Sequence, residues 1–278
     1  CVTDDDIAVG CDEVAVTVAN VAPGVEASPL SQTVPYSEEI VTIVFTATDV
    51  TADSLSAALS WSSDGVTWYD GAPAGLMLDE GSCATSDGVN TCTWTVTGAV
   101  GVPQGTYTLR LAVADDGDTP TSADVTLVVD PEEAVVVFSG DNPSAVLVAS
   151  PGGQSGTFSL QVCVSERDVP LAGDISLAEV SMSLVPVGPG VPVQGVVVAT
   201  QTGDAKCVTF SFSGVPVNAY LATVEVDGGY YTGSSQDVLV VYDPSLGFTT
   251  GGGWFYWPDT ADEATGYAGD RTTFGYTI

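Results

Sequence analysis

The chain has 278 residues, enough for about two domains of ordinary size, and 45% of them are hydrophobic, so it can build buried cores. It carries 36 Asp and Glu against 4 Lys and Arg, with no His, and its formal net charge is −32. This charge excludes nucleic acid as a partner, because nothing would neutralise the phosphates, and it favours cations instead.

The composition predicts an all-β protein with many tight connections. Val and Thr are abundant, and both are β-branched residues that favour strands over helices. The 31 Gly and 16 Pro indicate frequent turns. We find no window with sustained helical periodicity, and no uninterrupted apolar run of about 18 residues that would span a membrane.

One pattern recurs three times along the chain. An acidic turn, an alternating strand and an exit linker lie within 113–131, and similar segments stand 111 positions earlier, at 2–20, and 113 positions later, at 226–244. Repetition at a near-constant offset is typical of tandem domains.

A tyrosine identifies the kind of domain. Tyr107 and Tyr220 each follow a Val-Pro turn and open a strand of period two, as the tyrosine corner of a Greek-key sandwich does. We therefore predict tandem immunoglobulin-like Greek-key β-sandwiches. The expected parts are 1–20, the last hairpin of a preceding domain; 21–131 and 132–244, two complete domains; and 245–278, the start of a further β module.

The early strands of the first domain are clear in the sequence. Apolar residues alternate over 41–47 and again over 55–61, which predicts two half-buried strands. Trp61 is expected to be the core tryptophan of the third strand. Asp64 and Gly65 predict a two-residue hairpin turn that leads directly into a returning strand.

Six cysteines in an acidic β protein indicate an oxidising compartment. Two pairs are close in sequence and flank hairpin-like segments, which leaves the remaining two cysteines for each other. These two, Cys163 and Cys207, point outward from strands that are expected to be neighbours, so their disulfide would be a cross-strand bridge. The inferred pairs are Cys1–Cys11, Cys83–Cys92 and Cys163–Cys207.

The first half of the chain resembles bacterial PKD-type and cadherin-like immunoglobulin-like repeats. The resemblance rests on 16–23, a strand that runs into an N-V-A-P linker, and on 45–55 followed by Trp61. Near the end, 247–254 with 274–276 resembles a C-terminal module of bacterial secreted and surface proteins that contains T-G-G-G-W. These resemblances imply a large extracellular repeat protein.

Acidic residues gather in two loops that belong at the same end of an immunoglobulin-like sandwich. Calcium takes six to eight oxygen ligands and would offset the repulsion among them. The alternative is a pair of solvated turns in which Asp bonds the backbone. The candidate calcium ligands are Asp49, Asp53, Asp115, Asp116 and Asp118. A similar group is Asp4, Asp5 and Asp6, and a weaker one in the second domain is Asp168, Asp174 and Asp227.

Two aromatic groups are candidate contact surfaces. Tyr230 and Tyr231, in a turn of the second domain, are expected to be exposed and to contact a neighbouring module or subunit. A run near the C-terminus is a candidate interface, with a sugar-binding platform as the alternative. That run is Trp254, Phe255, Tyr256 and Trp257.

We expect no catalysis, since a chain without His has no Ser–His or Cys–His pair and no insertion that would form a cleft interrupts either domain. The predicted function is that of a non-enzymatic, secreted or cell-surface structural protein, as a segment or subunit of a filament, sheath or stalk. Its partners would be copies of itself or neighbouring domains. The alternatives are a rod-like spacer of an adhesin and a carbohydrate-binding accessory module.

Overall fold

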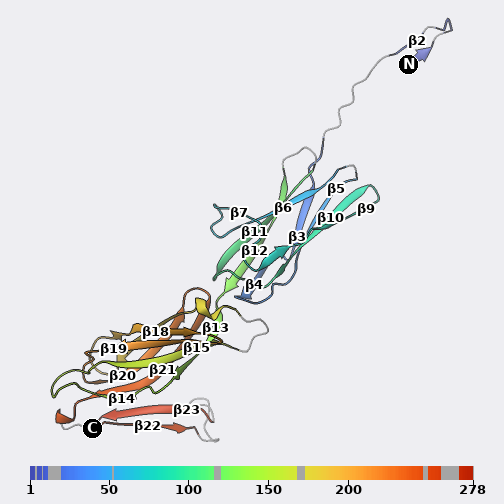
Figure 1. The fold of residues 1–278 in the computed structure, drawn as a ribbon. Helices are drawn as coiled ribbons and strands as arrows, with labels where there is room; N and C mark the ends of the chain where they lie inside the picture. The colour runs from blue at the N-terminus through green and yellow to red at the C-terminus, as the bar shows by residue number, and fades with distance from the viewer. Residues whose placement is uncertain are drawn as a thin grey trace.

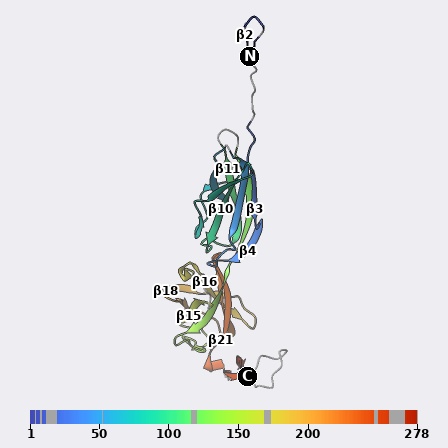
Figure 2. The same cartoon turned by 90° about the vertical axis from the view of Figure 1, so that its right-hand side faces the viewer.

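The computed structural model describes residues 1–3, 5–7, 9–11, 20–51, 53–115, 120–167, 173–246, 250–257 and 269–277. In these parts the regular structure is β-strand apart from two short 3₁₀ turns, η1 (Ile175–Leu177) and η2 (Pro244–Leu246). Figures 1 and 2 show two β-sandwiches placed end to end, with one hairpin beyond the first sandwich and another beside the second. Within the described ranges, no helix has the length and apolar character needed to cross a membrane.

The N-terminal hairpin consists of β1 (Val2–Thr3) and β2 (Val9–Gly10), which pair antiparallel. The Cys1–Cys11 disulfide closes it, with the two Cα atoms 4.0 Å apart. The strand that the alternation predicts over 14–18 lies outside the described residues.

The first sandwich contains two sheets that face each other across one core. One sheet has the order β3 (Gly24–Ser28), β5 (Ile43–Val50), β10 (Val89–Gly98) and β8 (Leu76–Leu78), and β9 (Ser82–Ser86) also pairs with β10. The other has the order β4 (Ser31–Pro35), β12 (Thr121–Asp130), β11 (Gly105–Ala114), β6 (Ser56–Ser62) and β7 (Tyr69–Asp70).

The second sandwich has the same strand order, in two layers. One layer has the order β13 (Glu132–Ser139), β15 (Phe158–Glu166), β19 (Lys206–Phe212) and β18 (Val196–Thr202). The other contains β14 (Ala145–Leu147), β21 (Tyr231–Tyr242), β20 (Asn218–Asp227), β16 (Glu179–Pro186) and β17 (Val193–Gln194). The two layers are joined into one nine-stranded sheet, because Glu132 and Glu133 at the start of β13 pair parallel with β21. In immunoglobulin nomenclature each domain has an A-B-E-D sheet packed on an A′-G-F-C-C′ sheet, so the predicted fold class is confirmed.

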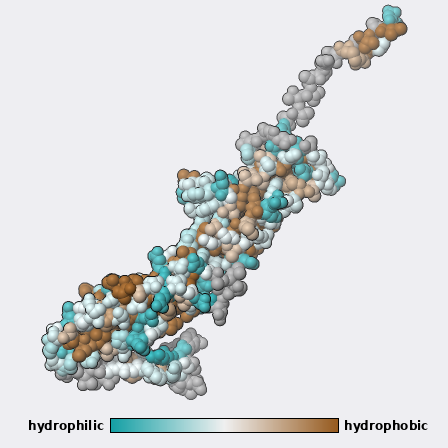
Figure 3. Space-filling view, in the orientation of Figure 1, coloured by the Kyte–Doolittle hydropathy of each residue, from teal (hydrophilic) through white to brown (hydrophobic). Residues whose placement is uncertain are grey.

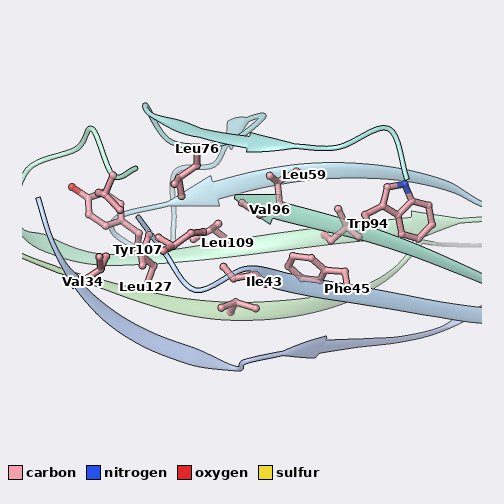
Figure 4. Close-up of a cluster of buried hydrophobic side chains, with 14 of the residues drawn as sticks. Val34, Ile43, Phe45, Leu59, Leu76, Trp94, Val96, Tyr107, Leu109 and Leu127 are labelled. Carbon is pink, nitrogen blue, oxygen red and sulfur yellow. The ribbon is translucent and has the colours of Figure 1, made fainter. Parts of the chain in front are cut away.

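Alternating side chains build the cores. Every second residue of β5 and β11 points inward, and Phe45, Leu109 and Leu111 are completely buried. Figure 4 shows side chains from both sheets of the first domain meeting in one cluster. Burying an aliphatic or Phe side chain contributes about 1.5–3 kcal/mol, so these rows hold each sandwich together.

Both tyrosine corners are present. The Tyr107 hydroxyl donates to the carbonyl of Pro103 at 2.8 Å, and the Tyr220 hydroxyl donates to the carbonyl of Pro216 at 2.9 Å. Each bond spans four residues, so it ties the start of the F strand to the turn before it.

One expectation about the first domain held only in part and another was wrong. Trp61 lies on the C strand and packs against the core, but it is only partly buried and stacks on Tyr69, whereas Trp94 on β10 is 6% exposed. Asp64 and Gly65 do not form a two-residue hairpin, because β6 pairs with β7 only from Ser60–Asp70 and Trp61–Tyr69, which leaves a loop over 63–68.

That loop is longer because the Asp64 carboxylate organises it. Oδ1 of Asp64 accepts the backbone N–H groups of Val66 and Thr67 at 2.8 and 2.7 Å, and Oδ2 accepts the Thr67 hydroxyl at 2.9 Å. These bonds lower the pKa of Asp64 to about 2, and the bond from the Thr67 backbone N–H has the largest effect. The side chain thus provides the bonds that a tight turn would have made between strands.

The six cysteines form the pairs that their spacing predicts. Cys83–Cys92 joins β9 to β10, and Cys163–Cys207 joins directly opposed residues of β15 and β19. The second of these is therefore a cross-strand bridge on the outer face of its sheet.

The C-terminal hairpin consists of β22 (Thr250–Tyr256) and β23 (Arg271–Thr277). It lies beside the G strand of the second domain, where a Cβ on Gly275 would come within 3.3 Å of the Val238 side chain. A glycine at this position allows the two backbones to approach closely.

Candidate metal centre and interdomain junction

Three carboxylates meet at the N-terminal end of the first domain. Asp49 is near the end of β5, Asp53 is in the following loop, and Asp115 directly follows β11. One carboxylate oxygen from each lies within 4.8 Å of the other two. The structure thus brings together three of the five predicted ligands, whereas Asp116 and Asp118 are outside the described residues. Asp49 belongs to the strand itself rather than to the loop after it.

Neighbouring amides hold this cluster in place. The Asn20 side chain donates to Oδ2 of Asp115 at 2.7 Å, which ties the entering linker to the end of the F strand. The Asn90 side chain donates to the backbone carbonyl of Asp53 at 3.0 Å. The cluster therefore joins the linker, the B strand, the B–C loop and the F strand.

One oxygen of the cluster is buried without a partner. Oδ1 of Asp49 accepts the N–H of Val50 at 2.7 Å, but Oδ2 is enclosed and has no hydrogen-bond partner among the described residues. Two charges 4.8 Å apart repel by about 3 kcal/mol at an effective dielectric constant of about 20. An unsatisfied carboxylate oxygen among three repelling carboxylates has the chemistry of a site for a hard cation.

The acidic residues of the second domain have a different role. Oδ1 of Asp174 accepts the Ser176 N–H at 3.0 Å and caps η1, and Oδ1 of Asp227 accepts the Gly228 N–H at 2.8 Å. Asp168 and Asp4 lie outside the described residues. Asp174 and Asp227 therefore organise turns, as the alternative interpretation of these acids predicts.

The two domains meet at a short and closely packed junction. Only Pro131 separates β12 from β13. Tyr36, which follows β4 of the first domain, packs edge-on against Tyr230 and Tyr231 of the second, with ring centroids 5.0 and 5.5 Å apart. The side chain of Tyr36 belongs to a buried cluster that otherwise comes from the second domain.

Polar contacts complete the junction. The hydroxyl of Ser37 donates to Oε2 of Glu132 at 2.7 Å, and the backbone N–H of Gln104 donates to the carbonyl of Gly229 at 2.6 Å. The Tyr36 hydroxyl accepts the N–H of Asp174 at 3.3 Å. Each of these bonds crosses from one domain to the other, so the domains are held by more than their linker.

A buried acid lies at the centre of the junction. Glu132 is 4% exposed, and its Oε1 atom has no hydrogen-bond partner in the described part of the chain. Burial raises the pKa of Glu132, the Ser37 bond lowers it, and the nearby Glu166 and Glu38 carboxylates raise it further. The pKa of Tyr231 is raised as well, mainly by burial and then by the hydrogen bond that its hydroxyl donates to Glu166.

The expectation that Tyr230 and Tyr231 are exposed was wrong. Tyr231 is completely buried and Tyr230 is partly buried, because both contact the first domain. Sequence reasoning also missed Tyr36 and Glu132, which come from separate domains and have no spacing signal in common. The sequence offers one hint of a close junction: the large side chain of Tyr36 directly follows the A′ strand, and the linker is the single residue Pro131.

The aromatic run near the C-terminus lies on both sides of a hairpin. Trp254 and Tyr256, 56% and 58% exposed, share the side that faces the second domain, and Phe255 and Trp257 are in edge contact with each other. A groove of about 480 Å³ lies between this hairpin and β21. Its lining includes Trp254, Arg271 and Asp237.

No protein-family model and no curated protein matches the sequence. Among solved structures, an adhesin of Yersinia pseudotuberculosis, InvE, is 17% identical over 78% of this chain, with a TM-score of 0.38. The chain spans 58% of that structure. A tandem of titin immunoglobulin domains is 15% identical over 81% of this chain and 98% of its own, with a TM-score of 0.30. The immunoglobulin-like assignment itself rests on the strand order and the tyrosine corners.

Proposed function

We propose that the chain is a non-enzymatic, extracellular structural segment that acts as a stiff spacer. The observation that carries this proposal is the junction, where a single-residue linker and the inserted Tyr36 oppose bending between the sandwiches. Three disulfides fit a protein that folds in an oxidising compartment outside the cytosol. A surface or secreted protein of repeated domains, as the PKD-type and T-G-G-G-W resemblances imply, uses such segments to hold other parts at a distance.

We further propose that Asp49, Asp53 and Asp115 bind Ca²⁺. The residues fit this ion, because they offer carboxylate oxygens, one of which is buried and unsatisfied. The Asn20 amide is a further candidate ligand, since a flip about its side-chain amide would turn its oxygen toward the ion. The bound ion would neutralise the repulsion between the acids and fasten the linker to the first domain.

Thermal unfolding with and without calcium tests this site. For an ion present at 100 times its dissociation constant, binding adds about 2.7 kcal/mol to the stability of the folded state. At about 4 °C per kcal/mol, the first-domain transition should rise by about 10 °C. Asp49→Asn should abolish the shift, whereas Asp70→Asn, an exposed acid of the same domain, should keep it. A calcium-independent melting temperature in the wild type would remove calcium from the proposal.

Two forms of the structural role differ in how the chain behaves in solution. A subunit of a filament or sheath assembles under native conditions, whereas a spacer within an adhesin stays monomeric and extended. Small-angle scattering across a range of concentrations separates them through the mass and the maximum dimension of the particle. A compact particle, shorter than two sandwiches in line, would contradict both forms.

The groove beside the C-terminal hairpin favours carbohydrate binding as a second candidate function. An exposed indole next to polar groups is a suitable platform for stacking a sugar ring, and Trp254 has both features. Binding on a glycan array that Trp254→Ala removes, and that Phe255→Ala on the opposite side of the hairpin retains, would support this function. An array without any bound glycan would rule it out.

A further inference from the structure

The outer edge of β21 is bracketed by two strand pieces. β13 pairs with the start of β21 through Glu132 and Glu133, and then crosses to β15. β14 pairs with the end of β21, from Val240 onward. Within the described ranges no strand covers the part of this edge between them, residues 234–238, which we call the open stretch of β21.

The backbone of the open stretch directs hydrogen-bonding groups toward this edge. Successive residues of an antiparallel strand bond alternately to its two sides, and odd-numbered residues of β21 bond to β20. The even-numbered residues face the edge, since the Val240 N–H donates there to the Ser144 carbonyl at 3.0 Å. Ser234, Gln236 and Val238 therefore point their N–H and C=O groups into the open stretch.

A side chain takes the place of a strand at one end of the open stretch. The N–H of Val238 donates to Oδ1 of the neighbouring Asp237 at 2.8 Å, so a carboxylate satisfies a group that a strand would otherwise bond. A row of such backbone groups at a sheet edge is a template for a further extended segment. The open stretch therefore has the chemistry of a position for an added strand.

A hollow lies at each end of the open stretch. The first, of about 580 Å³, is lined by Glu133 and Ala134 of β13 and by 232–234 of β21. The second is the groove of about 480 Å³ beside the C-terminal hairpin, whose lining includes Ala145 of β14 and 237–238 of β21. A strand rises about 3.4 Å per residue, so the open stretch is about 17 Å long and matches an extended peptide of about five residues.

The charges around the open stretch favour a basic partner. The two hollows are lined by two arginines and by four acids, Glu133, Glu225, Asp227 and Asp237. Arg167 already pairs with Glu133 at 2.6 Å, and Arg271 lies over the ring of Trp254. A second copy of this chain offers only 4 Lys and Arg in 278 residues, so the complementary charge has to come from a different protein.

We propose that the open stretch of β21 binds an extended, basic peptide segment of another protein, which pairs with it as an added strand. The peptide occupies the middle of the A′ position, between β13 and β14, and its Lys or Arg side chains lie near the four acids. The proposal goes beyond the stiff spacer, because it gives this segment a binding site that lies within one domain and does not depend on the junction.

The edge of β18 is less suitable for such a strand. Figure 3 shows hydrophobic surface gathered over β18, and this strand carries no charged residue that would attract a basic peptide. Its register against β19 shifts between Val197 and Ala199, and such a bulge interrupts the row of backbone groups that a new strand needs. Both features favour β21 over β18.

Titration calorimetry of the full chain with a synthetic peptide tests the proposal. The probe is a seven-residue peptide of alternating Lys and Thr, blocked at both ends. It should bind with a dissociation constant below about 1 mM, and the affinity should fall as salt screens the acids. The same peptide with Glu in place of Lys should not bind. A version methylated on every backbone nitrogen keeps the charge but cannot donate to β21, and it should not bind either.

Variants of the open stretch locate the peptide. Gln236→Pro removes an N–H that faces the edge and leaves the bonds to β20, so it should weaken binding at least about tenfold. Gln236→Ala keeps the backbone, loses the same side-chain bond to Thr223, and should bind as the wild type does. Glu225→Gln with Asp237→Asn should weaken binding and flatten its salt dependence. In the wild type, the peptide should slow hydrogen exchange at the amides of Ser234 and Gln236.

The outcomes separate strand pairing from attraction between charges. Weaker binding by Gln236→Pro than by Gln236→Ala, together with slower amide exchange in the wild type, supports the proposal. If Gln236→Pro melts at a lower temperature, amide exchange in the wild type decides alone. No binding at about 1 mM peptide, equal binding by the methylated peptide, or unchanged exchange at Ser234 and Gln236 overturns it. Each of these failures leaves the stiff spacer standing, because that role is tested by the shape of the chain.

Discussion

Replacing Glu132 with Gln is expected to stabilise the interdomain junction at neutral pH. The carboxyl group is 4% exposed, and Oε1 has no hydrogen-bond partner in the described residues. Gln keeps an oxygen for the Ser37 hydroxyl and removes a buried charge that faces Glu38 and Glu166. A charged group is more costly to bury than a neutral amide, and the new NH2 group can donate where the carboxylate was repelled, so we expect a gain on the order of 1 kcal/mol.

The gain should depend on pH in a defined direction. Because burial raises the pKa of Glu132 in the folded state, the folded protein holds this proton more tightly than the unfolded chain does. The stability that the folded wild type gains from this bound proton is fully present below the unfolded pKa of about 4.3. It is lost as the pH rises through the folded pKa of Glu132. The difference in stability between Glu132→Gln and the wild type should therefore grow from pH 4 to pH 8.

Urea unfolding at several pH values measures this difference. Glu133→Gln is the matched control, since Glu133 is the adjacent residue, is exposed and pairs with Arg167. That control should leave the pH dependence close to that of the wild type. If Glu132→Gln were less stable than the wild type at pH 8, or if the difference did not change with pH, the assigned environment of Glu132 would be wrong.

Two further predictions concern single domains. Removing the Cys163–Cys207 bridge by replacing both cysteines with Ser opens a loop of 44 residues and should cost about 4 kcal/mol in the second domain, which calorimetry would resolve from an unchanged first domain. Tyr107→Phe leaves the Pro103 carbonyl without its partner and should cost the first domain about 1–2 kcal/mol in urea unfolding. If either change destabilised only the domain that does not contain it, the two sandwiches would not have separate cores.

Much of each sandwich could be predicted because alternation and turn chemistry are local. The period-two rows that begin at Tyr107 and Tyr220 are the F strands, and both hydroxyls make the bonds that the motif implies. The convergence of Asp49, Asp53 and Asp115 followed from the same topology, since the B–C and F–G loops share one end of the sandwich.

The junction could not be predicted, because its contacts join residues far apart in the sequence. Tyr36 and Tyr231 pack together across the boundary between the domains, and nothing local to either residue indicates the other. The prediction of a two-residue turn at Asp64 and Gly65 failed for a different reason. A dipeptide rule assumes that strand pairing sets the loop length, but here a carboxylate that accepts several hydrogen bonds set it.

The stiffness of the junction is the central claim, and the distance across it is the most direct test. Met77 in the first domain and Val137 in the second are exposed strand residues, suited to spin labels on unnatural amino acids. Pulsed electron resonance should give one narrow distance distribution in the wild type. Tyr36→Ala, which removes two aromatic contacts and about 3 kcal/mol of junction packing, should broaden it. A broad distribution in the wild type, or no change in the variant, would contradict a stiff spacer.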